Sequence, residues 1–529
     1  MKNYAKFDFF EIQAIFTNAE IINGNSDWQA IGVSTNTRTI EAKNIFVALA
    51  GEKFDGHNYI EEAITKNASA IVVEKKWYHA FNENILAIQK NINHNPPNIL
   101  IIVVENTIVA LGELAFFHRM RFNFPVLAIA GSNGKTSTKE LIYSVLSQKY
   151  KTLKTYKNFN NRIGVPLMML QFSEEYEMAI IEIGTNEPGE IAILSKMLSP
   201  NYGLITNIGK EHLELLKDLD EVEIEETFLF GQLLKTGGNC FINFDDARLK
   251  KYAKVITNNI TYGAKNSEIN AQADVTVQKN FTVQKDDTVE ADFTVEIEFD
   301  DFLYPTLKYK ISHLTQDKIY SVKINSIGLA IALNAIAAVA VGYGTGLTGE
   351  EISEGLENFE PAIDGYARMV VEEINGIKVL NDCYNANPSS MEMSLKTLSM
   401  LKNIDYKIAI LGDMFELGDS AKEEHISIIN LALNLADEVI VTGSNMTTAA
   451  NELHSRTSNA KLKAFNIFSE ISEYISDFNS NADSRKIAIL VKASRGMAME
   501  KLIEKMHSRH GCAFLSFNFK NSSSRAASS

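Results

Sequence analysis

The sequence predicts an α/β protein of several domains, each built on a largely parallel sheet. Short apolar runs recur along the chain, and most are followed by a segment with the apolar spacing of an amphipathic helix. Strands that alternate with helices in this way are typical of parallel, doubly wound sheets. The length agrees, because 529 residues at about 150 residues per domain correspond to three or four domains.

Composition narrows the class of protein. Hydrophobic residues make up 45% of the chain and charged residues 22%, which excludes coiled-coil, collagen-like and wholly disordered chains. The net charge of −15 disfavours a general nucleic-acid or anionic membrane surface. Three cysteines without disulfide or zinc spacing, and a start without the apolar stretch of a signal peptide, predict a protein of the reducing cytoplasm.

Three α/β domains and a tail are predicted. Residues 1–106 hold the β-rich runs GVSTN, NIFVAL, AIVVE and NILIIVV and form a small N-terminal domain. Residues 107–364 form a central domain with a doubly wound parallel sheet, interrupted at about 265–323 by a β-hairpin or meander insertion. Residues 365–510 form a C-terminal Rossmann-like α/β domain, and residues 511–529 are small and polar, as in a flexible tail.

The apolar run GLAIALNAIAAVAVG at 328–342 resembles a membrane span at first sight. It is shorter than the roughly 20 apolar residues that a span needs and it contains Asn334, so a buried helix is predicted. Thr348, with Glu351 three residues later, then forms a capping-box pattern that starts the next helix. A nucleotide loop at the nearby glycines is the weaker interpretation.

A phosphate loop is the strongest local motif, because it lies between an apolar strand and an amphipathic helix. Backbone N–H groups of such a loop bind phosphate oxygens, a lysine neutralises the β- and γ-phosphates, and a threonine hydroxyl is a ligand for Mg²⁺. ATP binding is therefore predicted, although Ile129 stands where the usual motif begins with glycine and a plain strand-to-helix turn is the alternative. The loop residues are Gly131, Ser132, Asn133, Gly134, Lys135, Thr136 and Ser137.

Polar residues follow the next two predicted strands. Glu182 ends AIIE and His212 follows TNIGKE, both at the edge of a parallel sheet where ligands bind. A carboxylate and an imidazole near the phosphates suit a magnesium site. A surface acid and a solvated loop histidine are the alternatives. Between the two motifs, the amide-rich segment 158–166, which includes Asn161, is interpreted as an anion-orienting loop or as a simple turn.

Taken in order, seven strings closely resemble the Mur ligase family: GSNGKTSTKE, NFNNRIGVP, EIGTNEPGEI, TNIGKEHLE, NDCYNANPSSM, LGDMFELG and LVKASRGMAME. The N-terminal string TNTRTIEAKNIFVALAGEKFDGHNYIEEA resembles an element of the family branch that adds D-Ala-D-Ala. The resemblance runs from about residue 30 to about residue 505. It implies a three-domain architecture with a central phosphate-loop domain.

The resemblance also implies an activity in peptidoglycan precursor synthesis. A ligase of this branch uses ATP and Mg²⁺ to join D-Ala-D-Ala to UDP-N-acetylmuramoyl-tripeptide through an acyl phosphate. The implied partners are these two substrates. Separately from the resemblance, the chain is expected to bind no nucleic acid, not to insert into a membrane and to be a monomer. Two alternatives stay open, a Mur-like ligase for a different amine and a nucleotide-binding scaffold that does not ligate.

Residue roles are carried over from the family position by position. Lys135 is implied to neutralise phosphate, Thr136 and Glu182 to hold one Mg²⁺, and Glu182 with His212 to help hold a second. Asn161 is implied to steady the transferring group. Positions that match nucleotide contacts are Asn334, Arg368, Asp382, Tyr384 and Asn385, and positions that match the UDP-sugar surface are Thr37, Arg38, Gly56 and His57.

The chain departs from the family pattern at several places, two of which concern the predicted site. Where most relatives carry a carbamylated lysine that binds the second metal, the residue aligned by counting from His212 is Glu226. Direct replacement of the carbamate by Glu226 is one hypothesis, and the other is a solvated acidic helix face formed by Asp220, Glu221, Glu223, Glu225 and Glu226. Ala330 and Ile331 also replace the family pair that precedes the apolar helix, so the adenine contacts are expected to differ.

Overall fold

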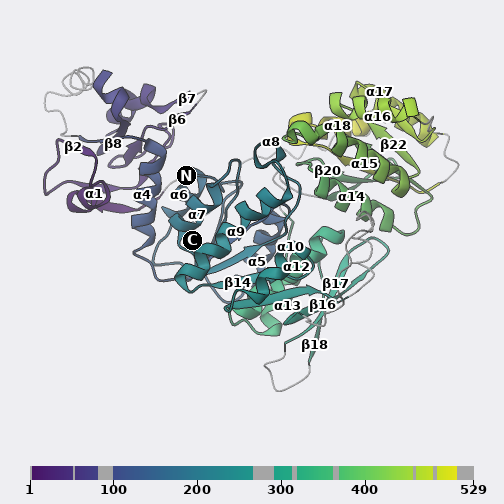
Figure 1. Ribbon diagram of the computed structural model, residues 1–529, viewed down its shortest axis with the longest axis horizontal. Coiled ribbons are helices and arrows are strands. Elements are labelled where there is room, and N and C mark those ends of the chain that lie inside the picture. Colours follow the sequence, from purple (N-terminus) through teal and green to yellow (C-terminus); the bar gives the residue numbers. More distant parts are fainter. Residues whose placement is uncertain are drawn as a thin grey trace, which may run out of the picture. The chain divides into compact units, whose positions relative to one another are not determined.

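The computed structural model describes residues 3–51, 54–80, 99–265, 291–311, 318–361, 369–456, 460–480 and 485–508. The chain divides into two compact units, Met1–Asp300 with Tyr304–Pro361, and Asp301–Leu303 with Ala362–Ser529. Figure 1 shows the elements of both units coloured along the sequence. The boundary proposed between the first two domains, at 106/107, lies inside the first unit and stays a prediction. The boundary predicted at 364/365 and the predicted tail at 511–529 lie outside the described residues.

The N-terminal part of the first unit contains a five-stranded sheet in the order β2-β9-β8-β5-β4. Four of its strands are parallel and β2 is antiparallel. The four runs predicted as strands are therefore confirmed. Its strands are β2 (Glu20–Ile22), β4 (Val33–Ser34), β5 (Ile45–Val47), β8 (Ala70–Glu74) and β9 (Leu100–Val104). The neighbouring elements are β1 (Lys6–Asp8), α1 (Phe9–Ile15), β3 (Gln29–Ile31), β6 (Ala50–Gly51), β7 (Phe54–Asp55), η1 (Gly56–Tyr59) and α2 (Ile60–Thr65).

A nine-stranded sheet in the order β11-β12-β10-β13-β14-β15-β16-β17-β18 forms the centre of the first unit. Its strands are β10 (Val126–Ala130), β11 (Thr152–Lys154), β12 (Met178–Glu182), β13 (Tyr202–Ile205), β14 (Asn239–Asn243), β15 (Asn259–Ala264), β16 (Phe293–Phe299), β17 (Pro305–Lys310) and β18 (Ile319–Lys323). Strand pairs from β11 to β16 are parallel, and β16, β17 and β18 pair antiparallel. The predicted meander is thus confirmed in the described residues, where it extends the central sheet. Residues 266–290 and 312–317 of the predicted insertion lie outside them.

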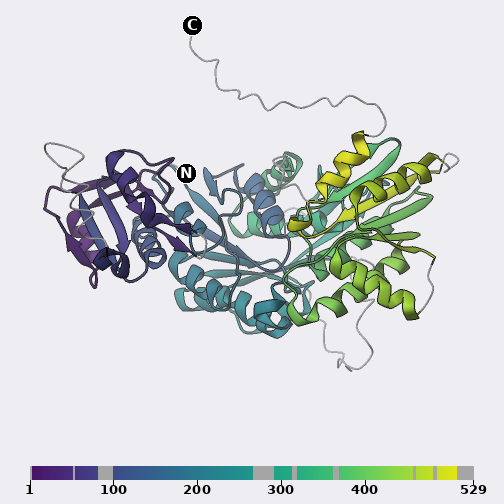
Figure 2. The same cartoon turned by 90° about the horizontal axis from the view of Figure 1, so that it is seen from above.

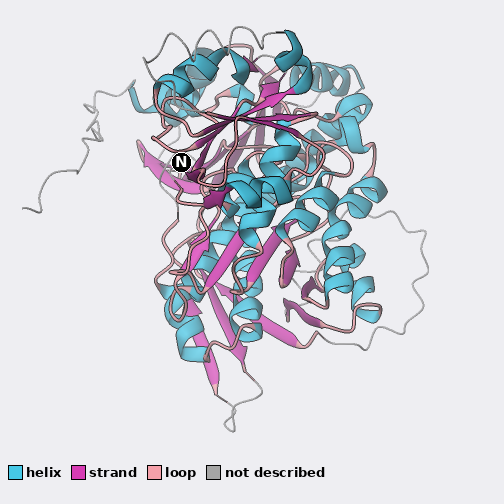
Figure 3. Ribbon diagram, turned by 90° about the vertical axis from the view of Figure 1, so that its left-hand side faces the viewer, coloured by secondary structure: helices cyan, strands magenta, loops and turns pink. Residues whose placement is uncertain are grey.

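Alternate residues of each strand point to opposite faces of this sheet. Both faces are apolar, and helices cover both of them. Leu127 and Ile129 of β10 pack in one core with α5 (Lys135–Leu146), α12 (Leu329–Gly344) and α13 (Gly349–Glu357). Ala128 and Ala130 pack in the other core with α4 (Thr107–Arg119), α6 (Gly164–Met169), α7 (Glu190–Leu198) and α9 (Leu219–Thr236). Figure 3 shows these sheets in magenta between cyan helices. The doubly wound parallel sheet is confirmed.

The apolar helix behaves as predicted. Most of α12 is buried in the core that it shares with α5. No helix in the described part of the chain is long and apolar enough to cross a membrane. The next helix, α13, begins with the predicted capping box between Thr348 and Glu351. The shorter helices of this region are α8 (Leu213–Leu216), α10 (Ala247–Lys250) and η2 (Lys251–Lys254).

The second unit is built on a six-stranded sheet in the order β19-β20-β24-β21-β22-β23. Among the described strands of this sheet, only β19 is antiparallel to its neighbour. Figure 2 shows helices above and below this sheet, as a Rossmann-like fold requires. Its strands are β19 (Val370–Ile374), β20 (Ile377–Asp382), β21 (Tyr406–Leu411), β22 (Glu438–Val441), β23 (Leu462–Ala464) and β24 (Ile487–Lys492). Its helices are α14 (Pro388–Met400), η3 (Gly418–Ser420), α15 (Ala421–Leu435), α16 (Ser444–Arg456), α17 (Phe468–Ser480), η4 (Arg495–Met497) and α18 (Glu500–Ser508).

Candidate functional site

The phosphate loop joins β10 to α5 and depends on two glycines. Gly131 and Gly134 have φ values of +112° and +82°, in the left-handed region that side chains disfavour. A Cβ on Gly131 would also lie 2.3 Å from Thr206 Oγ1, and a Cβ on Gly134 would lie 2.7 Å from Asn334 Oδ1. The backbone therefore passes closer to its neighbours than any other residue type allows.

The end of β13 supports the loop from below. Asn207 O accepts a hydrogen bond from Ser132 N at 2.9 Å, and the Asn207 side chain bonds both the N–H (3.2 Å) and the carbonyl (2.9 Å) of Asn133. Gly209 N donates to Ser132 Oγ at 2.8 Å. These contacts arise because β10 and β13 are parallel neighbours whose carboxyl ends meet. Asn207 is a site residue that the sequence reasoning missed.

Lys135 begins α5 and folds back over the loop. Its Nζ donates to Gly131 O and lies 3.5 Å from Ser132 O and 3.7 Å from Glu211 Oε2. Loop, helix N-terminus and ammonium group thus converge where a phosphate chain binds in phosphate-loop proteins. A plain strand-to-helix turn does not account for this arrangement.

Glu182, at the end of β12, lies beside the loop as predicted. Thr136 Oγ1 donates to Glu182 Oε2 at 3.1 Å, and Asn160 Nδ2 donates to Oε1 at 3.0 Å. Lys139 Nζ, on the next turn of α5, lies 3.7 Å from Oε2. Glu182 is 3% exposed and Lys139 1%, so the alternative of a surface acid is wrong. The sequence reasoning did not identify Lys139.

The amide-rich segment contributes through Asn160 and less directly through Asn161. Asn161 Oδ1 accepts hydrogen bonds from Ile163 N (3.1 Å) and Gly164 N (2.9 Å) and so supports the start of α6. The role of Asn161 toward the transferring group stays a prediction. Asn160, which contacts Glu182, was not singled out because neighbouring amides cannot be ranked from sequence.

His212 follows β13 in a left-handed conformation, with φ of +48°. Its Nε2 lies 3.9 Å from Glu211 Oε2, and its side chain is 23% exposed. Glu211 is buried and also lies 3.7 Å from Lys135. The histidine therefore belongs to the charged group around the loop, which argues against the solvated-loop alternative. Glu211 was missed, although it stands next to His212 in the sequence.

Glu226 lies directly below the phosphate loop. Its side chain is 0% exposed, and Oε2 accepts a hydrogen bond from Gly131 N at 2.7 Å. Burial raises the pKa of Glu226 well above its ordinary value and nearby Glu211 raises it further, whereas Lys135 and the Gly131 N–H act in the opposite direction.

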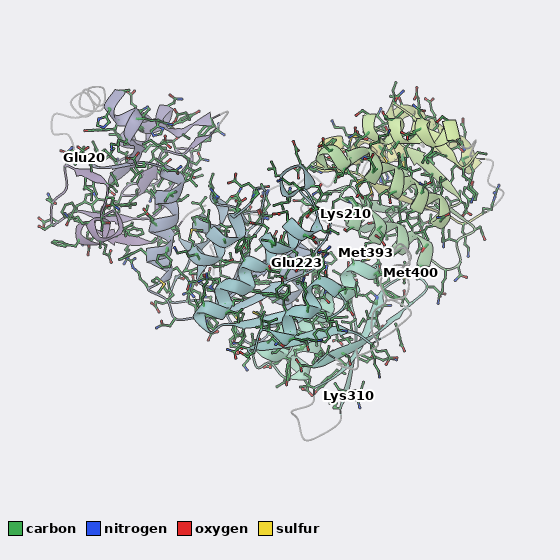
Figure 4. All side chains as sticks on the ribbon, viewed as in Figure 1. Glu20, Lys210, Glu223, Lys310, Met393 and Met400 are labelled. Atoms are coloured by element: carbon green, nitrogen blue, oxygen red, sulfur yellow. The ribbon has the colours of Figure 1, made fainter. Side chains whose placement is uncertain are left out.

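The hypothesis of a solvated acidic face on α9 is wrong for three of its five residues. Asp220 and Glu221 are exposed, but Glu223, Glu225 and Glu226 are buried. Glu223, marked in Figure 4, pairs with Arg248 at 3.0 Å. Glu225 accepts hydrogen bonds from Gly189 N (2.6 Å) and Ile191 N (2.8 Å) and so caps the start of α7. These acids are structural anchors between elements.

The side chains around the phosphate loop suit a Mg²⁺ ion that phosphate groups help to bind. In the described part of the chain, no three His, Cys, Asp or Glu side chains are close enough to form a metal cage. Phosphate-transfer sites do not require one, because Mg²⁺ is usually bound by one or two carboxylates together with substrate phosphates and water. A buried carboxylate bonded to the loop hydroxyl, as in Glu182 and Thr136, fits such a nucleotide-bound ion.

The predicted UDP-sugar residues belong to the N-terminal sheet. Arg38 is exposed, whereas Thr37 is buried and donates to Glu62 Oε2 at 2.8 Å. His57 is 4% exposed, with Nδ1 2.6 Å from Asp55 Oδ1 and Nε2 accepting from Glu74 N at 3.0 Å. Both ring nitrogens are thus used inside the fold. Gly56 packs tightly, since a Cβ there would lie 2.7 Å from Leu49 O. The ligand role of this group stays a prediction.

The residues predicted to reach the nucleotide belong to both units. Asn334 of α12 packs against Gly134 of the phosphate loop. On the same helix, Ala330 is exposed and Ile331 is buried. In the second unit, Asp382 Oδ2 accepts from Lys492 Nζ at 2.6 Å and Ser394 Oγ at 2.7 Å. The remaining positions, whose nucleotide contacts also stay predictions, are half-buried Tyr384, exposed Asn385, and Arg368, which lies outside the described residues.

Three family models match the chain. They are the Mur ligase family catalytic domain at residues 30–119, the Mur ligase middle domain at 129–342 and the Mur ligase glutamate ligase domain at 367–495. The middle-domain match contains the phosphate loop, Glu182, His212 and Glu226.

Full-length relatives agree with these matches. The UDP-N-acetylmuramoyl-tripeptide–D-alanyl-D-alanine ligase of Buchnera aphidicola from Acyrthosiphon pisum is 31% identical over 93% of this chain and 96% of its own length. A crystal structure of MurF from Acinetobacter baumannii matches with a TM-score of 0.77 and 25% identity, covering 96% of this chain and 99% of that one. The MurF ligase of Thermotoga maritima in complex with ADP shares the fold, with a TM-score of 0.70 and 23% identity over 90% of this chain and 97% of that one.

Proposed function

The chain belongs to the Mur ligase family, and on that premise we propose that it joins D-Ala-D-Ala to UDP-N-acetylmuramoyl-tripeptide in peptidoglycan precursor synthesis, with ATP converted to ADP and phosphate. The observation that carries the proposal is the contact of Thr136 with Glu182 at a phosphate loop, within a chain that matches ligases of this name over nearly its whole length. The contact supports ATP-dependent chemistry, and the relatives support the choice of substrates.

The first step activates the tripeptide carboxylate, which is a poor electrophile as it stands. A carboxylate oxygen bonds to the γ-phosphorus of ATP while the bond to the β-phosphate oxygen breaks, giving an acyl phosphate and ADP. Such a transfer depends mainly on positioning and charge neutralisation. Lys135 supplies a positive charge at the loop, and the N-terminus of α5 supplies backbone N–H groups. We propose that Thr136, Glu182, His212 and Glu226 would hold Mg²⁺, which would neutralise further phosphate charge.

The second step forms the amide bond. The dipeptide amine attacks the acyl carbon, a tetrahedral intermediate forms, and phosphate leaves with one former carboxylate oxygen as the nitrogen loses a proton. Asn161 is proposed to steady the transferring group, while Asn160 fixes Glu182 at 3.0 Å. The position of Glu182 is set further by Thr155, whose Oγ1 accepts from Glu182 N at 2.8 Å.

The remaining contacts of the ligands are proposed from the family positions. Arg38 is the exposed member of the proposed UDP-sugar group, and Asn334 lies against the loop that binds the phosphates. Tyr384 and Asn385 are proposed to contact the nucleotide from the second unit. The reaction is proposed to occur in the cytoplasm, by a monomer.

Mass spectrometry of the product tests the proposal. The full chain is incubated with ATP, Mg²⁺, UDP-N-acetylmuramoyl-tripeptide and D-Ala-D-Ala, while phosphate release is followed in parallel. The proposal expects a UDP-N-acetylmuramoyl-pentapeptide that is absent with Lys135→Ala. Tripeptides with lysine and with diaminopimelate at position three are both offered. Phosphate release without pentapeptide would indicate a different amine, and nucleotide binding without turnover would indicate a scaffold; either result overturns the assignment.

A further inference from the structure

Glu211 lies at the centre of a buried group of charges around the phosphate loop. Its Oε2 lies 3.7 Å from Lys135 Nζ and 3.9 Å from His212 Nε2. Glu226 reaches the same place from α9, since its carboxylate lies within hydrogen-bonding reach of the Glu211 side chain. The group thus combines the start of α5, the loop after β13 and the middle of α9. Lys210, next in the chain to Glu211, is marked in Figure 4.

Each of the two carboxylates keeps one oxygen that lacks a hydrogen-bond partner. Glu211 Oε1 and Glu226 Oε1 are both buried, and no donor among the described residues reaches either atom. Glu211 is 7% exposed and Glu226 0%, so bulk water does not solvate these two oxygens. Buried oxygens of this kind are costly unless a donor or a cation satisfies them. Two such oxygens on adjacent acids are satisfied either by a proton shared between the acids or by a cation that both acids bind.

Lys135 does not satisfy either of these two oxygens. Its Nζ approaches Glu211 through Oε2 and also bonds Gly131 O, which leaves both Oε1 atoms unmatched. In a phosphate loop the lysine binds the β- and γ-phosphates once nucleotide is present. Glu211 then loses its ammonium partner, while Glu226 keeps the hydrogen bond from Gly131 N.

We propose that Glu211 and Glu226 together bind a divalent cation, Mg²⁺ or Mn²⁺, when ATP occupies the phosphate loop. A carbamylated lysine offers two oxygens at the end of one long side chain. Here two shorter side chains from different elements each offer one unmatched oxygen, Oε1, and His212 Nε2 lies 3.9 Å from the other oxygen of Glu211, Oε2. Glu226 and Glu211 together then replace the carbamylated lysine, and each supplies one of its two oxygens. The inference rests on the proposed function, because ATP must draw Lys135 away from Glu211.

Counting bound Mn²⁺ by electron paramagnetic resonance tests the inference. Mn²⁺ takes the same oxygen ligands as Mg²⁺. The full chain is titrated with Mn²⁺ and β,γ-methylene ATP, the nucleotide being saturating for each variant in its own binding titration. The wild type is expected to bind two ions per chain, one at Thr136 and Glu182 and one at the acidic pair. Glu211→Gln and Glu226→Gln are each expected to bind one, or to weaken the second by at least about tenfold, the effect of losing even an outer-sphere partner.

The matched control is Glu221→Gln, which removes an exposed acid from the same helix as Glu226 and should keep both ions. Thermal unfolding identifies any variant that fails to fold, and Glu211→Asp then replaces Glu211→Gln, with a weakened second ion expected. Two ions of unchanged affinity in both glutamine variants overturn the inference, and indicate that a shared proton joins the acids. If the wild type still forms pentapeptide in that case, the proposed function stands. If the wild type binds two ions, the glutamine variants lose the second and no pentapeptide forms, only the proposed function is overturned.

Discussion

The Glu226 carboxylate accepts a hydrogen bond from the backbone N–H of Gly131 at 2.7 Å, which fixes α9 to the first glycine of the phosphate loop. The preceding residue, Glu225, holds the start of α7 through Gly189 and Ile191. Consecutive acids of one helix therefore anchor two different loops at the carboxyl edge of the central sheet. Substitutions of these acids should therefore alter the geometry of the site even where the substituted residue does not contact substrate.

Glu226 should make the enzyme independent of bicarbonate. A carbamylated lysine forms by addition of carbon dioxide, whereas a glutamate carboxylate needs no such step. Added bicarbonate should leave the rate of the wild type unchanged, and Glu226→Ala should lose most activity. In Glu226→Lys, partial recovery with bicarbonate is the expected signature of a carbamate. The measurement is phosphate release in bicarbonate-depleted and supplemented buffer, and a wild type that requires bicarbonate contradicts the replacement.

Lys139→Met should destabilise the protein by about 3 to 5 kcal/mol, the cost of leaving a buried charge without its partner. Lys139 Nζ lies 3.2 Å from Glu140 and 3.7 Å from Glu182, and Lys139 and Glu182 are almost fully buried. Lys154→Met is the matched control, because Lys154 pairs with the same Glu140 from a half-buried position and should cost about 1 kcal/mol. Denaturant unfolding compares the two variants, and equal costs would show that Lys139 does not balance Glu182.

Glu225→Ala should lower the free energy of unfolding by about 0.5 to 2 kcal/mol, the range for loss of a helix cap. The change leaves the N–H groups of Gly189 and Ile191 without their acceptor. Glu221→Ala removes an exposed acid from the same helix and should cost less than about 0.5 kcal/mol. Thermal and denaturant unfolding measure both, and a neutral Glu225→Ala contradicts the capping role.

His118 should make stability fall as the pH drops from about 6.5 to about 4. Burial and the nearby Arg121 lower the pKa of His118 from 6.5 to about 4, while its Nε2 lies 3.0 Å from Phe172 O. Between these values the unfolded chain binds the proton and the folded chain does not, so protonation favours unfolding. The contribution reaches about 3 kcal/mol at most.

A pair of variants isolates this contribution of His118. His118→Gln keeps a donor for Phe172 O and should flatten the dependence of unfolding free energy on pH. His79→Gln changes an exposed histidine and should leave the dependence as in the wild type. Equal pH profiles for all three proteins would show that His118 titrates normally in the folded state.

Motifs predicted much of the site, and tertiary packing decided the rest. Gly131 to Ser137 and Glu182 followed from residue order at strand ends, which the parallel sheet brings together. Lys139 and Asn207 were missed because their burial depends on neighbours distant in sequence.

The acids of α9 were misjudged by counting charges without following the helical phase. Glu226 lies four residues after Val222 and three before Leu229, on the same buried stripe as Phe230 and Leu233. That periodicity alone could have predicted that Glu226 points inward. Its contact with Gly131 could not have been predicted without the sheet order that places β10 beside β13.

Transfer of an oxygen atom from the tripeptide to phosphate tests the central claim most directly. The full chain is given UDP-N-acetylmuramoyl-tripeptide labelled with oxygen-18 in its terminal carboxylate, together with ATP, Mg²⁺ and D-Ala-D-Ala, and the released phosphate is examined by mass spectrometry. An acyl phosphate at the loop formed by Gly131 and Lys135 predicts that each phosphate carries one oxygen-18 atom and that pentapeptide forms in equal amount. Unlabelled phosphate would show that water attacks ATP, and it would contradict activation of the carboxylate.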